Sequence, residues 1–464
     1  MQAIQAVPRS TCKGTNVTVF GMGRSGLAAV DLLLDRDMNV TLVEEHPRPE
    51  LEVLRDTYEQ RGVRICIGSN LESVLSQTEL FVVSPGVPKN HQILQRARQK
   101  NIPVIGEIEL AARYLQTPII AVTGTNGKST TVRLIGSILQ ESGKQVFVGG
   151  NLGLPLCEAV ARLKASNPAN DYDYIVAEVS SFQLETIDGF KPWISVLLNV
   201  TPDHLDRHST QEEYQAAKQR IFENQTDQDW MVINIDDPIV ETMAGQAKAE
   251  RYEFSLCREV ARGMYLDGNL IRVRGQGMEE PLFTRGDIPM RGQHNVANAL
   301  AALSVGLLCQ CSKENMLKAL QKFPRIEHAM EPVRIWQGVT FINDSKGTNV
   351  DATLNALQSF EEPVVLILGG KDKGGDFARL SEVIHHGVKG IVVIGEAAPR
   401  IIDALKGTAP MTAASNLEDA VAQARSLTTS GDVVLFSPAC ASFDMFQNYH
   451  HRGLEFKRIV QELQ

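Results

Sequence analysis

Hydrophobic residues along the chain gather in short runs, and many stretches between the runs repeat apolar residues with helical spacing. Each run is about as long as one buried strand. Strands that alternate with helices predict mostly parallel sheets covered by helices, which is the α/β fold class. The predicted strands cover residues 16–20, 39–45, 80–87, 118–124, 145–150, 174–180, 193–200, 230–236, 339–344, 364–370, 391–395 and 432–439.

The runs fall into three series, separated near Thr117-Pro118 and Phe323-Pro324. A chain of 464 residues exceeds one ordinary core, because domains hold about 150 residues on average. We therefore predict three domains in series. A Rossmann-like domain covers residues 1–116, a central domain with a mostly parallel sheet covers 117–324, and a second Rossmann-like domain covers 325–464.

Composition excludes several classes of protein. The formal charge of −9 leaves no basic excess for binding nucleic acid. The apolar runs fall far short of the roughly 20 residues that cross a bilayer, and the N-terminus lacks a signal-peptide core. Seven cysteines without CxxC spacing favour reduced core thiols over disulfides or zinc. We expect a cytoplasmic monomer that binds neither nucleic acid nor membrane.

A glycine-rich loop follows the first predicted strand. Gly21, Gly23 and Gly26 precede a helical pattern, and Glu44 lies eighteen residues after Gly26, where the next strand ends. This βαβ unit is close to the dinucleotide fingerprint and by itself suggests NAD. Ser84 ends a later strand, where the ligands of open α/β sheets gather.

A second glycine loop, GTNGKST at residues 124–130, connects a buried strand to a helix. A standard Walker A loop has a further glycine where this chain has Val122. The context still predicts a P-loop-type ATPase domain, because Lys128 would reach the β and γ phosphates and the Ser129 or Thr130 hydroxyl would bind Mg²⁺. The alternative is a tight turn that happens to carry a lysine.

Candidate metal and phosphate ligands follow the neighbouring strands. Glu178 is a hard carboxylate suited to Mg²⁺, and Asn151 and His204 follow two other strands. His204 and His208 are four residues apart, but no HExxH motif accompanies them, so zinc is disfavoured. Packing or capping is an equal alternative for His204. The spacing around Lys218 favours a solvated lysine on an amphipathic helix.

Seven ordered stretches resemble the motifs of the Mur ligases: GTNGKST, AEVSSFQLE, NVTPDHLDRH, AAKQRIFEN, GQHNVANALAA, FINDSKGTN and SPACASFDMFQN. Within that family, SSFQLE and SPACAS are similar to the members that add D-glutamate to UDP-N-acetylmuramoyl-L-alanine, a precursor of peptidoglycan. The resemblance implies that ATP phosphorylates the free carboxylate of that substrate. The amine of D-glutamate would then attack the acyl phosphate, giving an amide, ADP and phosphate. Bringing these anions together requires lysines, Mg²⁺ and helix N-termini.

The resemblance also implies roles for single residues. For ATP it implies Gly124, Thr125, Asn126, Gly127, Lys128, Ser129, Thr130, Asn298 and Asp344, with His294 and Asn295 near the adenine. For Mg²⁺ it implies Ser129, Glu178, His204 and a carbamylated Lys218, which reverses the solvated-lysine interpretation. The catalytic set is Lys128, Asn151, Glu178, His204 and Lys218, and the D-glutamate set is Lys346, Thr348, Lys373, Ser442 and Tyr449. The resemblance implies that the first glycine loop binds the UDP end of the substrate, not NAD, through Gly21, Gly23, Ser25, Gly26, Glu44 and Ser84. Asn151 would contact the UDP-substrate nearer its reacting carboxylate, and His46 is a candidate to stack on uracil.

One position departs from the family pattern. Family members usually read His-Arg-x-Glu where this chain reads His328-Ala329-Met330-Glu331, so the arginine that contacts the nucleotide is missing. Charge-assisted hydrogen bonds of this kind contribute about 1.5 to 3 kcal/mol each. We predict weak ATP binding or slow turnover unless Arg325 substitutes.

Three other functions stay open at this point. The first alternative is another ATP-dependent amino-acid ligase, such as a folylpolyglutamate synthase or a Mur ligase that adds a different residue. The second is an NAD-dependent oxidoreductase with an incidental loop. The third is a catalytically inactive binding module. A ligase would need its third domain to close over ATP, because the substrate pockets lie on different domains and water must be kept from the acyl phosphate.

Overall fold

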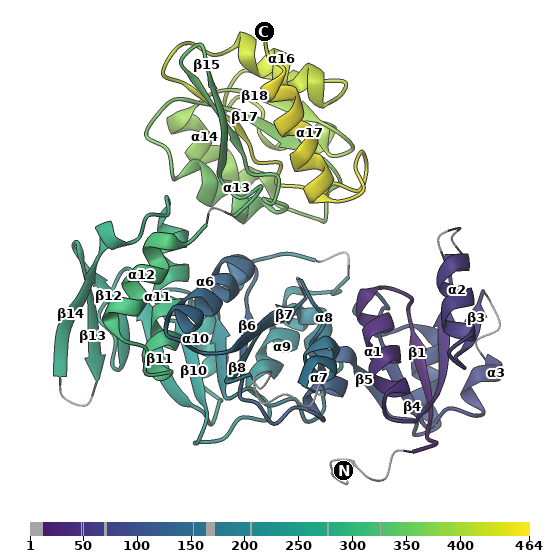
Figure 1. Ribbon diagram of the computed structural model, residues 1–464. Coiled ribbons are helices and arrows are strands. Elements are labelled where there is room, and N and C mark those ends of the chain that lie inside the picture. Colours follow the sequence, from purple (N-terminus) through teal and green to yellow (C-terminus); the bar gives the residue numbers. More distant parts are fainter. Residues whose placement is uncertain are drawn as a thin grey trace.

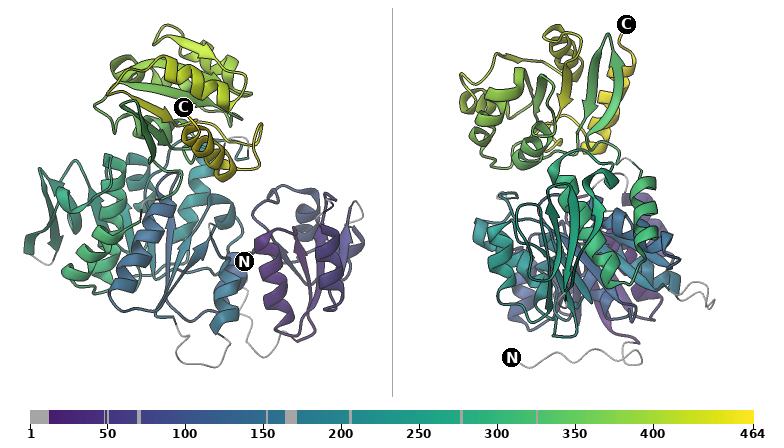
Figure 2. Two further views of the ribbon diagram at one scale, coloured as in Figure 1. Left: turned by 45° about the horizontal axis from the view of Figure 1, so that its top comes forward. Right: turned by 90° about the vertical axis from the view of Figure 1, so that its left-hand side faces the viewer.

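Three separate sheets, each flanked by helices, hold the strands of the described residues (Figure 1). The computed structural model describes residues 13–47, 49, 51–68, 72–151, 153–163, 172–204, 207–275, 278–324 and 326–464. The C-terminal domain lies above the central domain, and the N-terminal domain lies beside it (Figure 2). The predicted class, three α/β domains with mostly parallel sheets, is confirmed.

The first sheet has five parallel strands in the order β3-β2-β1-β4-β5, which is the order of a Rossmann-type sheet. Its elements are β1 (Asn16–Phe20), α1 (Arg24–Leu34), β2 (Asn39–Glu44), α2 (Leu51–Glu59), β3 (Arg64–Ile67), α3 (Glu72–Leu75), β4 (Leu80–Val83), α4 (Gln92–Gln99), β5 (Val104–Gly106) and the following α5 (Glu107–Ala112). The sequence pattern did not predict β3 and β5, which have only four and three residues.

The central sheet has nine strands in the order β14-β13-β12-β11-β10-β9-β6-β8-β7. Its elements are β6 (Ile119–Thr123), α6 (Lys128–Glu141), β7 (Val146–Gly150), α7 (Leu156–Leu163), β8 (Tyr174–Glu178), α8 (Ser181–Leu184), β9 (Ile194–Leu197), α9 (Gln211–Gln219), η2 (Arg220–Phe222), β10 (Trp230–Asn234), α10 (Pro238–Ala244), β11 (Glu250–Ser255), β12 (Gly263–Asp267), β13 (Leu270–Gly275), β14 (Met278–Thr284), η3 (Arg285–Asp287), α11 (Gln293–Leu308) and α12 (Lys313–Lys322). An antiparallel extension, β12 to β14, was not predicted because its strands carry many charged residues.

The third sheet has six strands in the order β15-β16-β20-β17-β18-β19, and only β15 runs antiparallel to its neighbour among the described pairs. Its elements are β15 (Glu331–Trp336), β16 (Val339–Asn343), α13 (Val350–Leu357), β17 (Val364–Gly369), η4 (Phe377–Leu380), α14 (Ser381–Gly387), β18 (Val388–Ile394), α15 (Ala398–Ala404), β19 (Met411–Ala413), α16 (Leu417–Ser426), β20 (Val433–Phe436) and α17 (Tyr449–Gln461). In Figure 1, α13 lies at the lower edge of this domain, facing the central domain.

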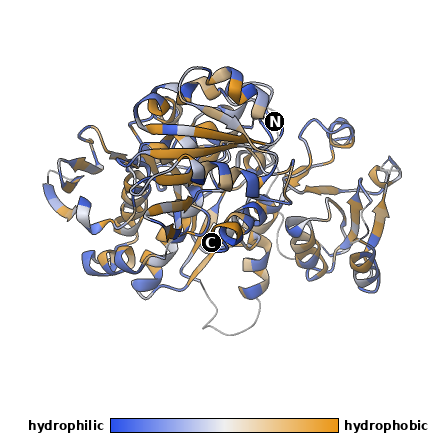
Figure 3. Cartoon of the chain, turned by 90° about the horizontal axis from the view of Figure 1, so that it is seen from above, coloured by the Kyte–Doolittle hydropathy of each residue, from blue (hydrophilic) through white to orange (hydrophobic). Residues whose placement is uncertain are grey.

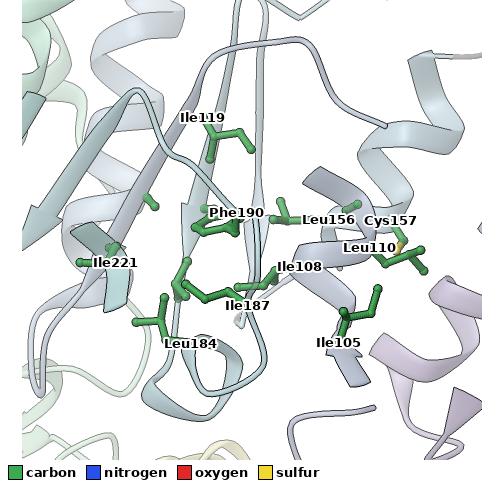
Figure 4. Packing of buried hydrophobic residues seen from close by; sticks show 14 of the residues in the cluster. Ile105, Ile108, Leu110, Ile119, Leu156, Cys157, Leu184, Ile187, Phe190 and Ile221 are labelled. Atoms are coloured by element: carbon green, nitrogen blue, oxygen red, sulfur yellow. The ribbon is translucent and has the colours of Figure 1, made fainter. Parts of the chain in front are cut away.

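Helix α5 joins the first two domains through a shared core. Ile108 and Leu110 of α5 pack in one hydrophobic cluster with Phe190 of the central domain (Figure 4). The buried carboxylate of Glu109 accepts three backbone N–H groups, from residues 188, 189 and 190. Hydrophobic colouring concentrates on the strands (Figure 3), which accords with buried sheets.

Two expectations from composition can be compared with the described residues. Their six cysteines are free thiols, of which four are buried, as predicted; Cys12 lies outside the described residues. Within the same residues, every helix is too short or too polar to pass through a membrane.

Candidate active site between the central and C-terminal domains

The second glycine loop begins where β6 ends. Val122 is fully buried inside that strand, so the loop turns first at Gly124 rather than at the usual earlier glycine. Gly127 has a φ of 86°, and a Cβ built there would lie 2.2 Å from Asn298 Oδ1. Only glycine fits this left-handed position. The tight fit holds Asn298, a predicted ATP residue, against the loop.

Lys128, the first residue of α6, folds back over the loop. Its Nζ donates to the carbonyl oxygens of Gly124 at 2.8 Å and Thr125 at 2.7 Å. Burial lowers the pKa of Lys128, while the Glu178 and Asp203 carboxylates oppose that shift. The helix start carries neither a capping side chain nor an acidic residue in its first turn. Its positive end therefore faces the loop, as an anion site requires.

Glu178 gathers two other predicted residues around its carboxylate at the end of β8. Ser129 Oγ donates to Oε2 at 2.7 Å, and Asn151 Nδ2 donates to Oε1 at 2.9 Å. Glu178 and Ser129 are buried, and Asn151 lies at the surface. A hydroxyl, a carboxylate and an amide form the hard oxygen donor set that Mg²⁺ prefers, so these residues fit that ion.

Lys218 is buried, which makes the solvated-lysine interpretation wrong. It lies on the face of α9 that also buries Tyr214 and Ala217, and its side chain is only 1% exposed. Its Nζ donates to Gly124 O at 2.8 Å and lies 4.6 Å from the centre of the Tyr214 ring. Burial and the nearby Lys128 ammonium hold the pKa of Lys218 well below its usual value. A lowered pKa favours the neutral amine that carbamylation needs.

His204 adopts a left-handed backbone conformation, with a φ of 57°. Such strained positions cluster at functional sites. Burial lowers the pKa of His204 to about 4, so the imidazole is neutral at pH 7. His208 is separate: its Nε2 lies 3.0 Å from Ser181 Oγ, and among the described residues the two histidines form no shared metal-ligand group.

Asp203, beside His204, was not predicted as a site residue. Its Oδ2 accepts from Asn349 Nδ2 at 3.0 Å, and its Oδ1 lies 3.6 Å from Lys373 Nζ. Burial raises the pKa of Asp203, but Lys373, His204 and Asn349 together lower it below the usual value. The group is thus an ionised carboxylate. Asp203 and Asn349 lie 146 positions apart, and no local pattern links them.

A cavity of about 340 Å³ lies beside this contact. Its lining includes Asp203 from the central domain and Thr348, Asn349 and Lys373 from the C-terminal domain. Two of the five residues predicted for D-glutamate, Thr348 and Lys373, therefore share one cavity.

Lys346 and Tyr449 belong to the C-terminal domain, as Thr348 and Lys373 do. Burial lowers the pKa of Lys346 to about 8, and the Glu178 carboxylate opposes this shift. The same carboxylate adds to the burial effect that raises the pKa of Tyr449. Ser442, the fifth predicted residue, is buried and does not line the cavity.

A pair of histidines anchors the helix that carries Tyr449. Asn343 Nδ2, a donor, lies 2.9 Å from His328 Nδ1, and Asn343 Oδ1 accepts from Ser345 N. His328 must therefore carry its proton on Nε2, which donates to His450 Nδ1 at 2.6 Å. This arrangement favours a hydrogen-bonded pair over a metal site, although Glu327 lies close to both histidines.

Asp344 is buried beneath the predicted nucleotide site. Its Oδ2 accepts from Ser437 Oγ at 2.7 Å, and its Oδ1 accepts from Met330 N at 3.0 Å. Burial raises the pKa of Asp344 to about 7. Ala329 directly precedes Met330, so a side chain at position 329 starts beside this carboxylate, and Arg325 lies outside the described residues.

The first glycine loop closes tightly around Ser84. A Cβ at Gly26 would lie 1.9 Å from Gly21 O, and Ser84 Oγ donates to that same oxygen at 3.2 Å. Glu44 accepts from Met22 N at 3.1 Å, so its carboxylate braces the loop. Helix α1 then starts after Gly23 without a capping side chain. The structure brings the residues predicted for UDP to one place, Asn151 excepted, and His46 is exposed nearby.

Arg207 connects the segment after β4, residues 85–87, to the central domain. Its guanidinium donates to the carbonyl oxygens of Pro85, Gly86 and Val87, at 2.8 to 3.1 Å. It also lies 4.6 Å from the centre of the Phe182 ring. Sequence reasoning did not single out Arg207, because its partners lie about 120 positions away.

Comparisons with known proteins bear on the family of this arrangement. Residues 122–306 match the family described as "Mur ligase middle domain", residues 15–106 match "Mur ligase MurD-like, N-terminal domain", and residues 328–440 match "Mur ligase, glutamate ligase domain". The chain belongs to the Mur ligase family. The prediction drawn from the seven motifs is confirmed.

Curated relatives of this Mur ligase carry one name, UDP-N-acetylmuramoylalanine–D-glutamate ligase. The relative from Koribacter versatilis is 43% identical over 456 residues, covering 97% of this chain and 98% of the relative. The relative from Syntrophus aciditrophicus is 42% identical over 449 residues, covering 96% of this chain and 98% of the relative.

Solved structures share the fold of this Mur ligase at low sequence identity. A pseudomurein peptide ligase type C from Methanothermus fervidus has a TM-score of 0.60 at 16% identity, covering 97% of this chain and all of that one. UDP-N-acetylmuramate-alanine ligase MurC from Thermotoga maritima has a TM-score of 0.57 at 19% identity, covering 96% and 99%. MurF ligase from Thermotoga maritima, solved in complex with ADP, has a TM-score of 0.58 at 16% identity, covering 98% and 97%.

Proposed function

We propose that this Mur ligase joins D-glutamate to UDP-N-acetylmuramoyl-L-alanine, with ATP converted to ADP and phosphate, in the synthesis of peptidoglycan precursors. The observation that carries the proposal is the contact of Asn349 and Lys373 of the C-terminal domain with Asp203 of the central domain, where Thr348 and Lys373 line a cavity. A phosphate loop on one domain thus faces cationic and hydroxyl groups on another. The shared name of the full-length relatives supports the choice of substrates.

The reaction needs an activated carboxylate, because a free carboxylate would have to expel oxide. A carboxylate oxygen of the alanyl group attacks the γ phosphorus, and ADP leaves. The amine of D-glutamate then attacks the acyl carbon, an amide C–N bond forms, and the C–O bond to phosphate breaks. The amine loses a proton, and inorganic phosphate leaves with the substrate's own oxygen.

The ATP loop performs the first part of this task. The loop and the start of α6 are formed by Gly124, Thr125, Asn126, Gly127 and Thr130. Lys128 neutralises the terminal phosphates. Asn298 and Asp344 contact the nucleoside. Ser129, Glu178, His204 and a carbamylated Lys218 would hold Mg²⁺, which would neutralise phosphate charge. Asn151 orients the substrate near its reacting carboxylate.

The other two domains bind the remaining substrates. The first loop receives the UDP end through Gly21, Gly23, Ser25, Gly26, Glu44 and Ser84, by the helix N-terminus that α1 provides. Thr348, Lys373, Lys346, Ser442 and Tyr449 receive D-glutamate, a dicarboxylate that suits lysines and hydroxyls. The domains divide at residues 116–117 and 324–325. The protein acts as a monomer in the cytoplasm, where ATP is available.

Phosphate release tests the proposal. The protein is incubated with ATP, Mg²⁺ and UDP-N-acetylmuramoyl-L-alanine, and then with D-glutamate, L-glutamate or another amino acid. Release that requires D-glutamate supports the proposal. Release with a different amino acid would assign another ligase activity. NADH binding without ATP turnover would favour an oxidoreductase, and substrate binding without any release would indicate an inactive binding module.

A further inference from the structure

We propose that Asn349 is a positioning residue that latches the C-terminal domain onto the ATP loop of the central domain. The inference rests on the proposed function, because the latch would act on the step in which D-glutamate attacks. Asn349 is the residue before α13, and its side chain spans the interface between the two domains.

Three hydrogen bonds cross the interface at this one side chain. Asn349 Nδ2 donates to Asn126 Oδ1 at 3.1 Å and to Asp203 Oδ2 at 3.0 Å. Asn126 Nδ2 donates back to Asn349 Oδ1 at 3.4 Å. Asn349 is only 9% exposed, so these bonds form away from most of the solvent. The bond to Asp203 is charge-assisted, which makes it the strongest of the three.

The central-domain side of the latch is held firmly. Asn126 N donates to Asn199 Oδ1 at 2.8 Å, and Asn199 Nδ2 donates to Asn126 O at 3.1 Å. Asn199 follows β9, so the backbone of the ATP loop is fixed to the central sheet at residue 126. The side chain of Asn126 is left to contact Asn349.

The other side of the latch leads directly to the predicted D-glutamate residues. Thr348 precedes Asn349, and both line the cavity with Lys373 and Asp203. A domain seated by Asn349 therefore places Thr348 and Lys373 within a fixed distance of the ATP loop. An amine bound there would face an acyl phosphate formed at that loop. Small misplacements at this step reduce rates strongly, because the attack depends on orientation.

Asn349 also caps α13, and a test must separate the two roles. Its Oδ1 accepts from Ala352 N at 2.8 Å. Asn349→Ser keeps a good capping oxygen but is too short to cross the interface. Asn349→Asp keeps the cap and removes both amide donors, which places a second carboxylate against Asp203.

Asn416 offers a matched control in the same domain. It caps α16 through a bond from Asp419 N at 2.8 Å, and it is exposed. Asn416→Ser therefore changes a cap and nothing at the interface. We compare the four proteins by kcat and KM for D-glutamate, by thermal melting, and by small-angle scattering with ADP and UDP-substrate present.

The latch predicts a specific order of effects. Asn349→Ser lowers kcat/KM for D-glutamate about 10- to 100-fold, the range expected for a lost charge-assisted bond, and Asn349→Asp lowers it further. The melting temperature of Asn349→Ser equals that of Asn416→Ser. The radius of gyration of Asn349→Ser with ligands bound exceeds that of the unaltered chain.

Two outcomes would overturn the latch while the proposed function stands. In one, Asn349→Ser keeps the kcat/KM of an active unaltered chain. In the other, Asn416→Ser loses as much activity, which would assign the effect to capping. An unaltered chain without D-glutamate-dependent phosphate release would instead remove the proposed function, and the latch with it.

Discussion

The two glycine loops share a backbone design and differ in the side chains around it. Each follows a parallel strand and leads into a helix that starts after a glycine without a capping side chain. Around the central loop, Ser129 donates to the carboxylate of Glu178, and Lys128 donates to the carbonyl oxygens of Gly124 and Thr125. Around the first loop, Ser84 Oγ donates to Gly21 O and the carboxylate of Glu44 accepts from Met22 N, so both side chains brace the loop backbone.

This difference distinguishes a site that only binds a diphosphate from a site that transfers a phosphoryl group. A glycine loop and a helix N-terminus suffice to bind a diphosphate, because backbone N–H groups supply the attraction. Moving a phosphoryl group also requires positioned cations and metal ligands that stabilise developing charge. The central loop has a lysine, a hydroxyl and a carboxylate that suit these tasks, which accords with a transfer site, and the first loop accords with a binding site.

The largest predicted effect comes from removing the cation of the central loop. Lys128→Ala should lower kcat about 100- to 1000-fold, because one preorganised charge donor is lost from the transition state. Binding of the UDP-substrate, measured by calorimetry, should stay unchanged. Equal loss of UDP-substrate binding would mean that the two loops do not act separately.

A smaller change should follow from adding a cation beside Asp344. Ala329→Arg should raise ATP affinity about tenfold or more, since a charge-assisted bond contributes about 1.5 to 3 kcal/mol. Titration with a fluorescent ATP analogue measures the effect, with the uncharged Ala329→Gln as control. If the arginine and glutamine variants bind alike, the missing guanidinium does not limit this enzyme.

A weaker effect should follow at the first loop. Ser84→Ala removes the bond from Ser84 Oγ to Gly21 O. Because a neutral hydrogen bond contributes about 0.5 to 1.5 kcal/mol, affinity for the UDP-substrate should fall about fivefold with the KM for ATP unchanged. Ser76→Ala, at an exposed serine of the same domain, is the control. A change in ATP KM alone would contradict the assignment.

Removing the buried carboxylate of Glu107, in α5, should change the stability of the protein without changing its activity. Burial raises the pKa of Glu107 to about 7, from about 4.3 in the unfolded chain. Between these values the folded chain keeps a proton that the unfolded chain releases, so stability falls as pH rises and levels off above pH 7. The fall is about 4 kcal/mol, at about 1.4 kcal/mol per pH unit.

Glu107→Gln should remove that pH-dependent fall, because the amide does not ionise. Urea denaturation at pH 5 and pH 8 measures the difference, and Glu52→Gln, at an exposed position of α2, is the control. Parallel stability curves for the Glu107 and Glu52 variants would show that Glu107 does not hold its proton. Phosphate release at pH 7 should be the same in all three proteins.

Much of the scaffold could be predicted because its signals are local. β6, β8 and β9 are continuous apolar runs, and Glu178 ends one of them, where ligands of parallel sheets gather. The motif order identified the Mur ligase family, and the domain matches confirm it. The assignments of single residues to ATP, Mg²⁺ and the other substrates stay predictions.

The features that could not be predicted depend on contacts between residues far apart along the chain. The pattern around Lys218 predicts an exposed helical lysine, yet tertiary packing buries its side chain beside Gly124. Asp203, Asn349 and Arg207 each gain partners from another domain when the domains meet, so no periodicity marks these contacts. The antiparallel strands β12 to β14 were missed because their charged residues hide the alternation.

The most direct test of the account follows an oxygen atom. UDP-N-acetylmuramoyl-L-alanine labelled with ¹⁸O in its carboxylate is converted with ATP and D-glutamate, and the released phosphate is analysed by mass spectrometry. The account predicts one ¹⁸O in each phosphate, because the substrate carboxylate attacks phosphorus and its oxygen leaves with it. Unlabelled phosphate formed together with the amide would contradict activation of the carboxylate at the central loop.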